Sequence, residues 1–255
     1  MAAYLGGCAT AGRRTPPLPV AAGTAPWELP AAALGTQRLF RVSYDGPDGD
    51  GSFRLTLRLA APGRYQVVAV DPFGRSLWTL DAAAGQGLWI DHRARAACRL
   101  SGSFDLVASR LTPFPLAALP ALLLGRLPEP PAAGEGADAF DAPPSEDGRL
   151  EYRDDAGRRW TATLGPAGPR SWSFAEPDGE VPSVFWSRAE PSGEAYLSDR
   201  LRGVQLRWRE TVAEPLAALE PLAVPPAFAE VPCDELYPPL RSATTSGSGR
   251  RPATG

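Results

Sequence analysis

Residues 53–100 read FRLTLRLAAPGRYQVVAVDPFGRSLWTLDAAAGQGLWIDHRARAACRL, and this stretch decides the fold. Apolar and polar residues alternate along short runs, and glycine or proline interrupts the runs about every ten residues. Such spacing is typical of antiparallel strands that follow one another as a meander. We therefore expect one antiparallel sheet built from short strands.

The strands of this meander are of two kinds. The first, residues 53–59, has leucine or phenylalanine at every odd position and polar residues between them, the pattern of a sheet with one face in water. In the later strands, residues 65–70, 77–80 and 88–90, apolar residues occupy both faces. An apolar cover is therefore expected on both faces there, from a helix, from curling of the sheet, or from a ligand.

Two short helices are expected after the meander. Ser103 is a good N-cap for a helix that ends before Pro113. A second helical run, residues 116–124, ends at Gly125, a favourable residue for a helix C-terminus. These helices are the natural lid for the apolar face of the sheet.

Further strands are expected over residues 149–153, 159–164, 171–174, 184–189 and 204–210. The last of them alternates sharply, which we interpret as an exposed strand late in the sheet. Residues 216–222 are compatible with a short helix.

Composition describes a globular protein with a real core and excludes little else. The chain has 255 residues, of which 44% are hydrophobic and 22% charged. Its net charge of -3 gives no reason to expect binding to nucleic acid.

The N-terminal residues Leu5-Gly6-Gly7-Cys8 resemble the lipobox of bacterial lipoproteins, in which the cysteine becomes the acylated first residue. A secretory signal needs a basic start and an apolar run of about 7 to 15 residues, and the seven residues before Cys8 carry no charge. Either the true start lies upstream of Met1, or Cys8 is an ordinary thiol. Residues 9–25 favour lipidation, because a membrane-anchored domain needs a flexible tether.

Cys98 and Cys233 are the remaining cysteines. In an oxidising compartment they can form a disulfide between the end of the meander and the C-terminal segment. Two buried free thiols are the alternative, and spacing alone does not decide. No CxxC motif or Cys/His cluster indicates a metal site.

The sequence carries no motif of an enzyme. Its single histidine, His92, follows Asp91 at the end of an expected strand, and we interpret it as a solvated surface side chain. No serine lies in a G-x-S-x-G elbow, and a chain without lysine has no P-loop. We expect no catalytic residue, no cofactor and no metal.

Two motifs carry a resemblance to a known family. VVAVDPFGRSLWTL, residues 67–80, resembles the strand, Pro-x-Gly turn and strand of the LolB-type outer-membrane lipoprotein receptor, within the LolA/LolB lipoprotein-carrier superfamily. FPLAALPALLLGRLP, residues 114–128, resembles the Pro-Leu helix of that family. The likeness spans residues 37–210, and the insert 129–147 and the extension after Glu210 depart from the compact receptor.

The resemblance implies a mainly β (α+β) fold, in which a curved antiparallel sheet forms an incomplete β-barrel with a helical lid. It also implies an apolar cavity that receives the acyl chains of lipoproteins, a soluble LolA-like carrier as partner, and an outer-membrane location through a lipid anchor. The exposed apolar residue that helps membrane insertion in the family matches Phe73 here. The alternative is that Phe73 packs on the edge of the sheet.

Candidate cavity residues lie on the two-sided strands and the lid, and ordinary core packing is the alternative for each of them. They are Leu57, Val68, Val70, Leu77, Trp78, Leu80, Trp89, Ile90, Leu106, Leu111, Leu119 and Leu123. Filling such a cavity with hydrocarbon would gain about 0.8 kcal/mol for each buried methylene.

The chain accordingly divides into four parts. Residues 1–26 are the lipobox-like N-terminus and tether, and residues 27–214 the LolA/LolB-like half-barrel domain, with a mobile loop at 129–147. Residues 215–241 are a C-terminal extension, and residues 242–255 a disordered tail. We expect either a lipoprotein that binds acyl chains, or a non-catalytic structural or assembly lipoprotein with a filled interior that acts through protein partners.

Overall fold

The structure, a computed structural model, describes residues 25, 27–47, 49–101, 116–127, 148–153, 157–165, 168–189, 192–201 and 203–236. The expected helix at residues 103–111 lies outside these ranges, as do Cys8, Leu106, Leu111, the loop 129–147 and the tail 242–255. None of the helices within the described ranges has the length and apolar character that a membrane crossing requires.

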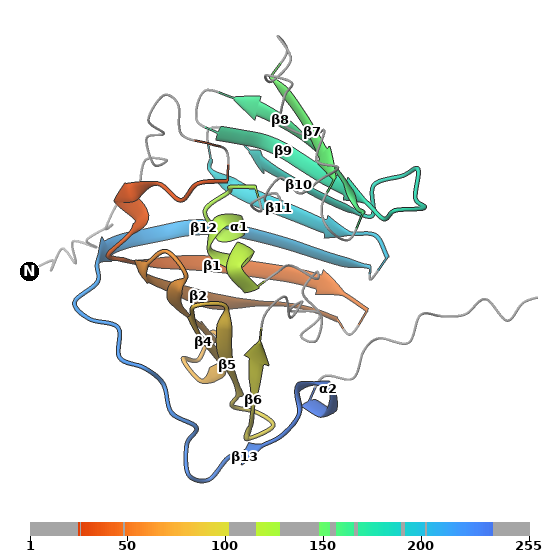
Figure 1. Cartoon of the computed structure of the whole chain (residues 1–255). Helices are drawn as coiled ribbons and strands as arrows, with labels where there is room; N and C mark the ends of the chain where they lie inside the picture. Colours follow the sequence, from red (N-terminus) through yellow and green to blue (C-terminus); the bar gives the residue numbers. More distant parts are fainter. Residues whose placement is uncertain are drawn as a thin grey trace, which may run out of the picture.

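Thirteen strands among the described residues form one sheet, in the order β13-β6-β5-β4-β3-β2-β1-β12-β11-β10-β9-β8-β7. The sheet is open and strongly curved (Figure 1). The expected fold class, mainly β with a curved antiparallel sheet and a small helical part, is confirmed. The strands are β1 (Thr36–Gly46), β2 (Gly49–Ala61), β3 (Arg64–Val70), β4 (Ser76–Ala83), β5 (Gln86–Asp91), β6 (Ala96–Ser101), β7 (Arg149–Arg153), β8 (Arg159–Gly165), β9 (Gly168–Ala175), β10 (Val184–Ala189), β11 (Glu194–Asp199), β12 (Val204–Pro215) and β13 (Ala229–Glu230).

The expected meander is present as β2 to β6, each strand antiparallel to the next. A row of directly paired residues crosses these strands on one face: Leu57, Val67, Leu80, Trp89 and Cys98. All of them are buried in the main core cluster. Alternation along the strands places their chain neighbours on the opposite face.

Strand β12 corrects one expectation. It lies in the middle of the sheet, between β1 and β11, and not at an exposed late position. Val204, Leu206 and Trp208 are buried in the main core, whereas the residues between them are exposed. Alternation reports which face of a strand is buried, and it does not report which strands are its neighbours.

The helices are short. Besides η1 (Ala31–Ala33) and α2 (Cys233–Leu236), residues 116–127 contain η3 (Leu116–Ala118) and α1 (Leu119–Leu123), which lie inside the curve of the sheet (Figure 1). We call residues 116–127 the plug. Gly125, at φ +72°, ends its helix, and a left-handed backbone there favours glycine. The expected helix at 116–124 is thus found within one residue of its expected end.

The outer face of β3 to β6 is covered by residues 216–230, which we call the strap. Leu222, Val224 and Phe228 pack against Leu88 and Ile90 there, in a second core cluster that also holds Ala97. The strap is extended and ends in β13, which pairs in parallel with β6. The expectation of an apolar cover on both faces is therefore met by two different segments.

The strap is tied to the sheet at several points. Gln66 Nε2 donates a hydrogen bond of 2.5 Å to the Glu220 carbonyl, and the Leu222 amide donates one of 2.9 Å to Asp81. The suggested helix over residues 216–222 is not formed, because these backbone groups bond to the sheet and Pro221 favours extended chain.

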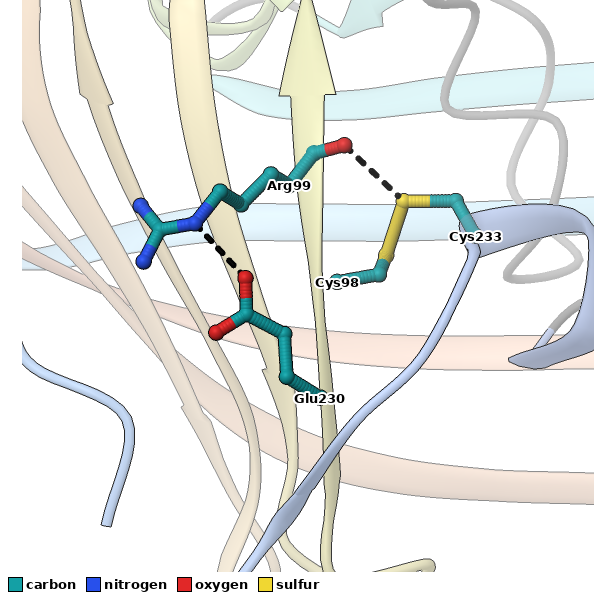
Figure 2. The surroundings of a disulfide bond; sticks show 4 residues. All are labelled: Cys98, Arg99, Glu230 and Cys233. Carbon is teal, nitrogen blue, oxygen red and sulfur yellow. Dashed lines mark hydrogen bonds and ion pairs between the residues drawn. A yellow bond between two sulfur atoms is a disulfide. The ribbon is translucent and has the colours of Figure 1, made fainter.

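The strap leads into a disulfide. Cys98 in β6 is bonded to Cys233 at the start of α2, with Cα atoms 5.1 Å apart (Figure 2). Beside it, Arg99 Nε donates a hydrogen bond of 2.7 Å to Glu230. The outer cover is thus fixed covalently to the last strand of the meander.

Candidate functional site

The candidate site is the inner face of the sheet together with the plug that fills it. On the β2 to β6 side, this face combines leucines with Tyr65 and Trp89, and Leu57 and Leu80 are each 0% exposed. On the β7 to β10 side it is aromatic. The rings there contact one another in a series, some stacked and some tilted, at centroid distances of 4.6–5.8 Å. They belong to Tyr152, Trp160, Trp172, Phe174 and Trp186.

The plug presents leucines to both sides of this inner face. Its buried members in the main cluster are Leu116, Leu119, Leu122, Leu123, Leu124 and Leu127. Five helical residues cannot hold a stable helix alone in water. The plug is therefore ordered by its packing on the sheet.

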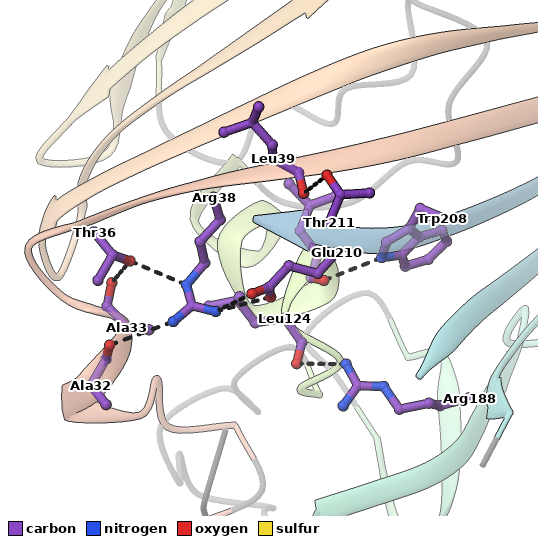
Figure 3. Close-up of polar contacts among 11 residues, drawn as sticks. Ala32, Ala33, Thr36, Arg38, Leu39, Leu124, Arg188, Trp208, Glu210 and Thr211 are labelled. Carbon is purple, nitrogen blue, oxygen red and sulfur yellow. Dashed lines mark hydrogen bonds and ion pairs between the residues drawn. The ribbon is translucent and has the colours of Figure 1, made fainter. Parts of the chain in front are cut away.

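Three hydrogen bonds from sheet side chains hold the plug by its backbone carbonyls. Tyr65 Oη donates to the carbonyl of Leu116. Trp208 Nε1 donates to Leu123 over 3.2 Å, and Arg188 Nη2 donates to Leu124 over 3.1 Å (Figure 3). The last carbonyls of a helix lack partners within the helix, so the donors to Leu123 and Leu124 satisfy groups that would otherwise be buried unpaired.

Burial strongly raises the pKa of the Tyr65 hydroxyl. Tyr65 therefore remains a neutral hydrogen-bond donor at neutral pH. A bond from a neutral donor to a carbonyl is worth about 1 kcal/mol net, so each of the bonds from Tyr65 and Trp208 can open at modest cost.

A largely buried ion pair fixes the inner face next to the plug. Arg38 Nη1 donates to both carboxylate oxygens of Glu210, at 2.9 Å each. Arg38 Nε also bonds Thr36 Oγ1 at 3.1 Å, and Thr36 in turn bonds the Ala33 carbonyl of η1 at 2.6 Å (Figure 3). The pair spans the irregular step in the β1–β12 ladder between Leu39 and Phe40, and joins η1 to the centre of the sheet.

Five of the candidate cavity residues meet on the inner face. Leu57, Leu80, Trp89, Leu119 and Leu123 all belong to the main cluster. Trp78 is partly buried against that cluster, and its ring stacks on Trp89 at 4.6 Å. In this state the leucines of the plug fill the inner face, so a ligand there requires the plug to move.

The other described candidates require a correction, because one cavity cannot contain them. Ile90 lies on the outer face under the strap. Val68 shares its row, since Val68 pairs with Thr79 and Thr79 with Ile90, and Val70 lies two residues further along the same face. Leu77 is half-buried at the irregular step between β3 and β4 and belongs to neither cluster. A two-sided apolar pattern does not say which residues share a face.

Phe73 stands at the tip of the β3–β4 turn with 85% of its surface exposed. The Asp71 carboxylate accepts hydrogen bonds from the amides of Phe73 and Arg75 and from Arg75 Nε, at 2.6–2.9 Å. Desolvation would raise the pKa of Asp71, but these hydrogen bonds and the charge of Arg75 lower it overall. The turn therefore holds the phenyl ring away from the sheet, and packing on the sheet edge does not occur.

Neither the residues that hold the plug nor the ion pair beside it were anticipated from the sequence. One signal was available for Arg38 of the ion pair, which shares its parity along β1 with the buried Phe40 and Val42. A charged residue within an apolar row indicates a buried polar contact. Trp208 and Tyr65 carried no such signal, because both also fit an ordinary apolar strand position.

Among the described residues, no group of three or more His, Cys, Asp or Glu side chains could hold a metal ion. His92 is half-buried, and its Nε2 lies 2.9 Å from Thr79 Oγ1. It is therefore not a fully solvated side chain as expected, because Phe228 of the strap packs against its ring at 5.8 Å.

No family model matches the chain, and no curated protein does. Solved structures similar to it include a LolA superfamily protein from Nitrosomonas europaea, with 13% identity and a TM-score of 0.47, over 76% of this chain and 90% of that one. Another is an outer membrane lipoprotein-sorting protein domain from Vibrio parahaemolyticus, with 10% identity and a TM-score of 0.44, over 72% of this chain and 86% of that one.

A third similar structure is a DUF1329 family protein from Desulfovibrio piger, with 9% identity and a TM-score of 0.45, over 72% of this chain and 87% of that one. Of the three, the first is named as a LolA superfamily protein, and none of the names gives the LolB type.

Proposed function

We propose that this chain is an envelope lipoprotein, anchored to the outer membrane through Cys8, that binds acyl chains on its inner face and helps to insert lipoproteins into that membrane. Its cargo would come from a soluble LolA-like carrier. The observation that carries the proposal is the plug. A short apolar segment covers an apolar face and is held there by packing and by side-chain hydrogen bonds to its carbonyls.

The leucines of the plug occupy the place that hydrocarbon chains would take. Each methylene buried on the inner face gains about 0.8 kcal/mol, so a chain of a dozen carbons can replace the apolar packing that the plug provides. No bond of the ligand needs to be broken, and the proposed activity accordingly requires no catalytic residue.

Phe73 supports the second half of the proposal. An exposed aromatic side chain on a turn braced by a tied-down carboxylate is suited to enter the interfacial region of a bilayer. The turn also carries Arg75, whose guanidinium lies 5.5 Å from the Phe73 ring centroid and can contact lipid phosphates.

Two measurements test the proposal. A fluorescent fatty acid should bind with a stoichiometry of one or a few chains and should increase the amide exchange of residues 119–126. Phe73→Glu should leave this binding intact and slow the transfer of an acylated peptide to vesicles of phosphatidylethanolamine and phosphatidylglycerol. Val212→Glu, which places the same charge at another exposed apolar position, is the matched control.

The filled interior supports a second function, that of a structural or assembly lipoprotein acting through protein partners. In the described residues the inner face is packed against the plug, with Leu57 and Leu80 completely enclosed. Absence of fatty-acid binding, together with an unchanged melting temperature on adding acylated peptide, would favour this second function and exclude the first.

A further inference from the structure

An arginine directly after the helix of the plug is buried without an acidic partner in the described part of the chain. Arg126 is 3% exposed, and its Nη1 atom is buried with no hydrogen-bond acceptor among the described residues. None of the ion pairs formed by those residues includes it, although the chain has 29 Asp and Glu residues. A guanidinium stays charged at neutral pH, and burying an uncompensated charge is costly.

A second arginine, Arg188, makes this burial less favourable. Burial lowers the pKa of Arg126, and the positive charge of Arg188 lowers it further. Arg188 comes from the end of β10 and reaches the plug, where it donates to the Leu124 carbonyl. Two cations from separate elements thus converge where the plug meets the sheet (Figure 3 shows Arg188 at Leu124).

Two glycines let the backbone approach these guanidinium groups closely. A Cβ at Gly168, the first residue of β9, would lie 3.0 Å from Arg126 Nη1, and one at Gly125 would lie 2.3 Å from Arg188 Nη2. Both glycines have positive φ, +113° and +72°. Any other residue would be strained there and would also displace the arginines.

A third arginine lies at the same end of the sheet. Ser171 pairs with Ser187, so the adjacent positions Arg170 and Arg188 lie beside each other on β9 and β10. Arg170 is exposed, whereas Arg126 is enclosed. The arginines thus form a positively charged series that runs from the exposed Arg170 to the buried Arg126.

We propose that Arg126 and Arg188, with Arg170 at the entrance, bind a phosphate group, and that this phosphate is the head group of a phospholipid-like amphiphile, whose chains bind the inner face in place of those of a lipoprotein. The inference rests on the proposed function for the apolar part of the ligand. Arginine suits phosphate because its planar fork donates two parallel hydrogen bonds to oxygen atoms.

The position of Arg188 couples the head group to the plug. Its Nη2 donor now holds the Leu124 carbonyl, and a phosphate offers it a charged and therefore stronger acceptor. Phosphate binding would release one of the three bonds that hold the plug. Recognition of the head group would thereby favour opening of the inner face to the acyl chains.

The test compares three probes. They are inorganic phosphate and two detergents below their critical micelle concentrations: dodecyl phosphate, and dodecyl maltoside, which has the same chain and no charge. Dissociation constants are measured by titration calorimetry on the wild type, on Arg126→Met, and on Arg209→Met, which removes an exposed arginine from β12. We expect dodecyl phosphate to bind about tenfold more tightly than dodecyl maltoside, and Arg126→Met to abolish this preference.

Folding of the variant is checked independently. Since Arg126 is buried with no acidic partner among the described residues, Arg126→Met should melt at the wild-type temperature or above it in phosphate-free buffer. Arg209→Met should leave all three dissociation constants unchanged. A well-folded Arg126→Met that keeps the preference for dodecyl phosphate would overturn the site.

The remaining outcomes separate the sources of the phosphate and the two proposals. Inorganic phosphate that binds as tightly as dodecyl phosphate, and is lost in Arg126→Met, would support a phosphate site and overturn the head-group assignment. Equal binding of both detergents would overturn the phosphate site while leaving the proposed function intact. Failure of both detergents to bind would overturn the proposed function.

Discussion

The two faces of strands β3 to β6 are covered by segments of opposite character. The plug on the inner face is a short helix of leucines, attached to the sheet by packing and by single hydrogen bonds to its carbonyls. The strap on the outer face is an extended chain with few apolar contacts, and it ends in a disulfide. The plug, which has more apolar contacts, is held only by non-covalent interactions. The strap, which has fewer, is also held by a covalent bond.

This difference fits the proposed function, which requires a sheet that is stable and whose inner face opens. Covalent closure of the outer face keeps Leu88 and Ile90 covered when the inner face changes. The inner cover, in contrast, can leave without breaking a covalent bond. The predictions below test this contrast, from the largest expected effect to the smallest.

Loss of the disulfide should have the largest effect. The bridge closes a loop of 135 residues, so Cys98→Ser with Cys233→Ser should lower the free energy of unfolding by about 4 kcal/mol in urea denaturation. The reduced wild type should give the same value. A loss below about 1 kcal/mol would mean that the strap is held mainly by its other contacts, and the contrast would fail.

The next prediction compares a leucine under each cover. Leu80→Ala removes a fully buried side chain from the inner face and should cost about 3 kcal/mol. Leu222→Ala removes a half-buried contact of the strap and should cost about 1 kcal/mol. Equal losses in chemical denaturation would show that the two apolar seals do not differ.

Trp208→Phe tests how much one hydrogen bond contributes to holding the plug. It removes the bond to the Leu123 carbonyl and should cost about 1 kcal/mol, equivalent to about fivefold faster amide exchange in the helix of the plug. Tyr44→Phe, which removes a hydroxyl next to the core but no bond to the plug, should leave that exchange unchanged. Unchanged exchange in Trp208→Phe would argue that packing alone holds the plug.

The smallest effect should be the pH dependence of stability that comes from His92, whose ring contacts Phe228 of the strap. Burial lowers the pKa of His92, opposed in part by the charge of Asp91. The unfolded chain therefore binds a proton more readily near pH 6.5 than the folded chain does, so stability should fall as the pH drops through that range. His92→Gln should flatten this dependence between pH 7.5 and 5. A slope that persists in His92→Gln would assign the titration to another group.

The meander and the plug could be predicted from sequence because both depend on local patterns. Period-two alternation marks β2, and Gly125 marks the end of the plug. The exposed tip at Phe73 follows from its Pro-Phe-Gly turn for the same reason. Each of these features depends on residues that are neighbours in the chain.

The strap, the place of β12 and the converging arginines could not be predicted, because they depend on contacts between distant residues. The strap has no periodicity, and only its register against β6 gives Phe228 a role. Likewise, Arg126 and Arg188 are separated by 62 positions, and nothing in the sequence around either one links it to the other. Their proximity arises only in the folded chain, where the end of the plug lies next to β10.

The brief parallel pairing of β13 with β6 has a consequence for solubility. An open sheet ends in rows of unpaired amides and carbonyls that invite another chain to add itself and begin a fibre. β13 blocks part of that template along β6. At the opposite end of the sheet, β7 places Arg149, Glu151 and Arg153 toward water, which discourages stacking. Although Phe73 is exposed, the two edges of the sheet thus offer little backbone on which further copies of the chain could add.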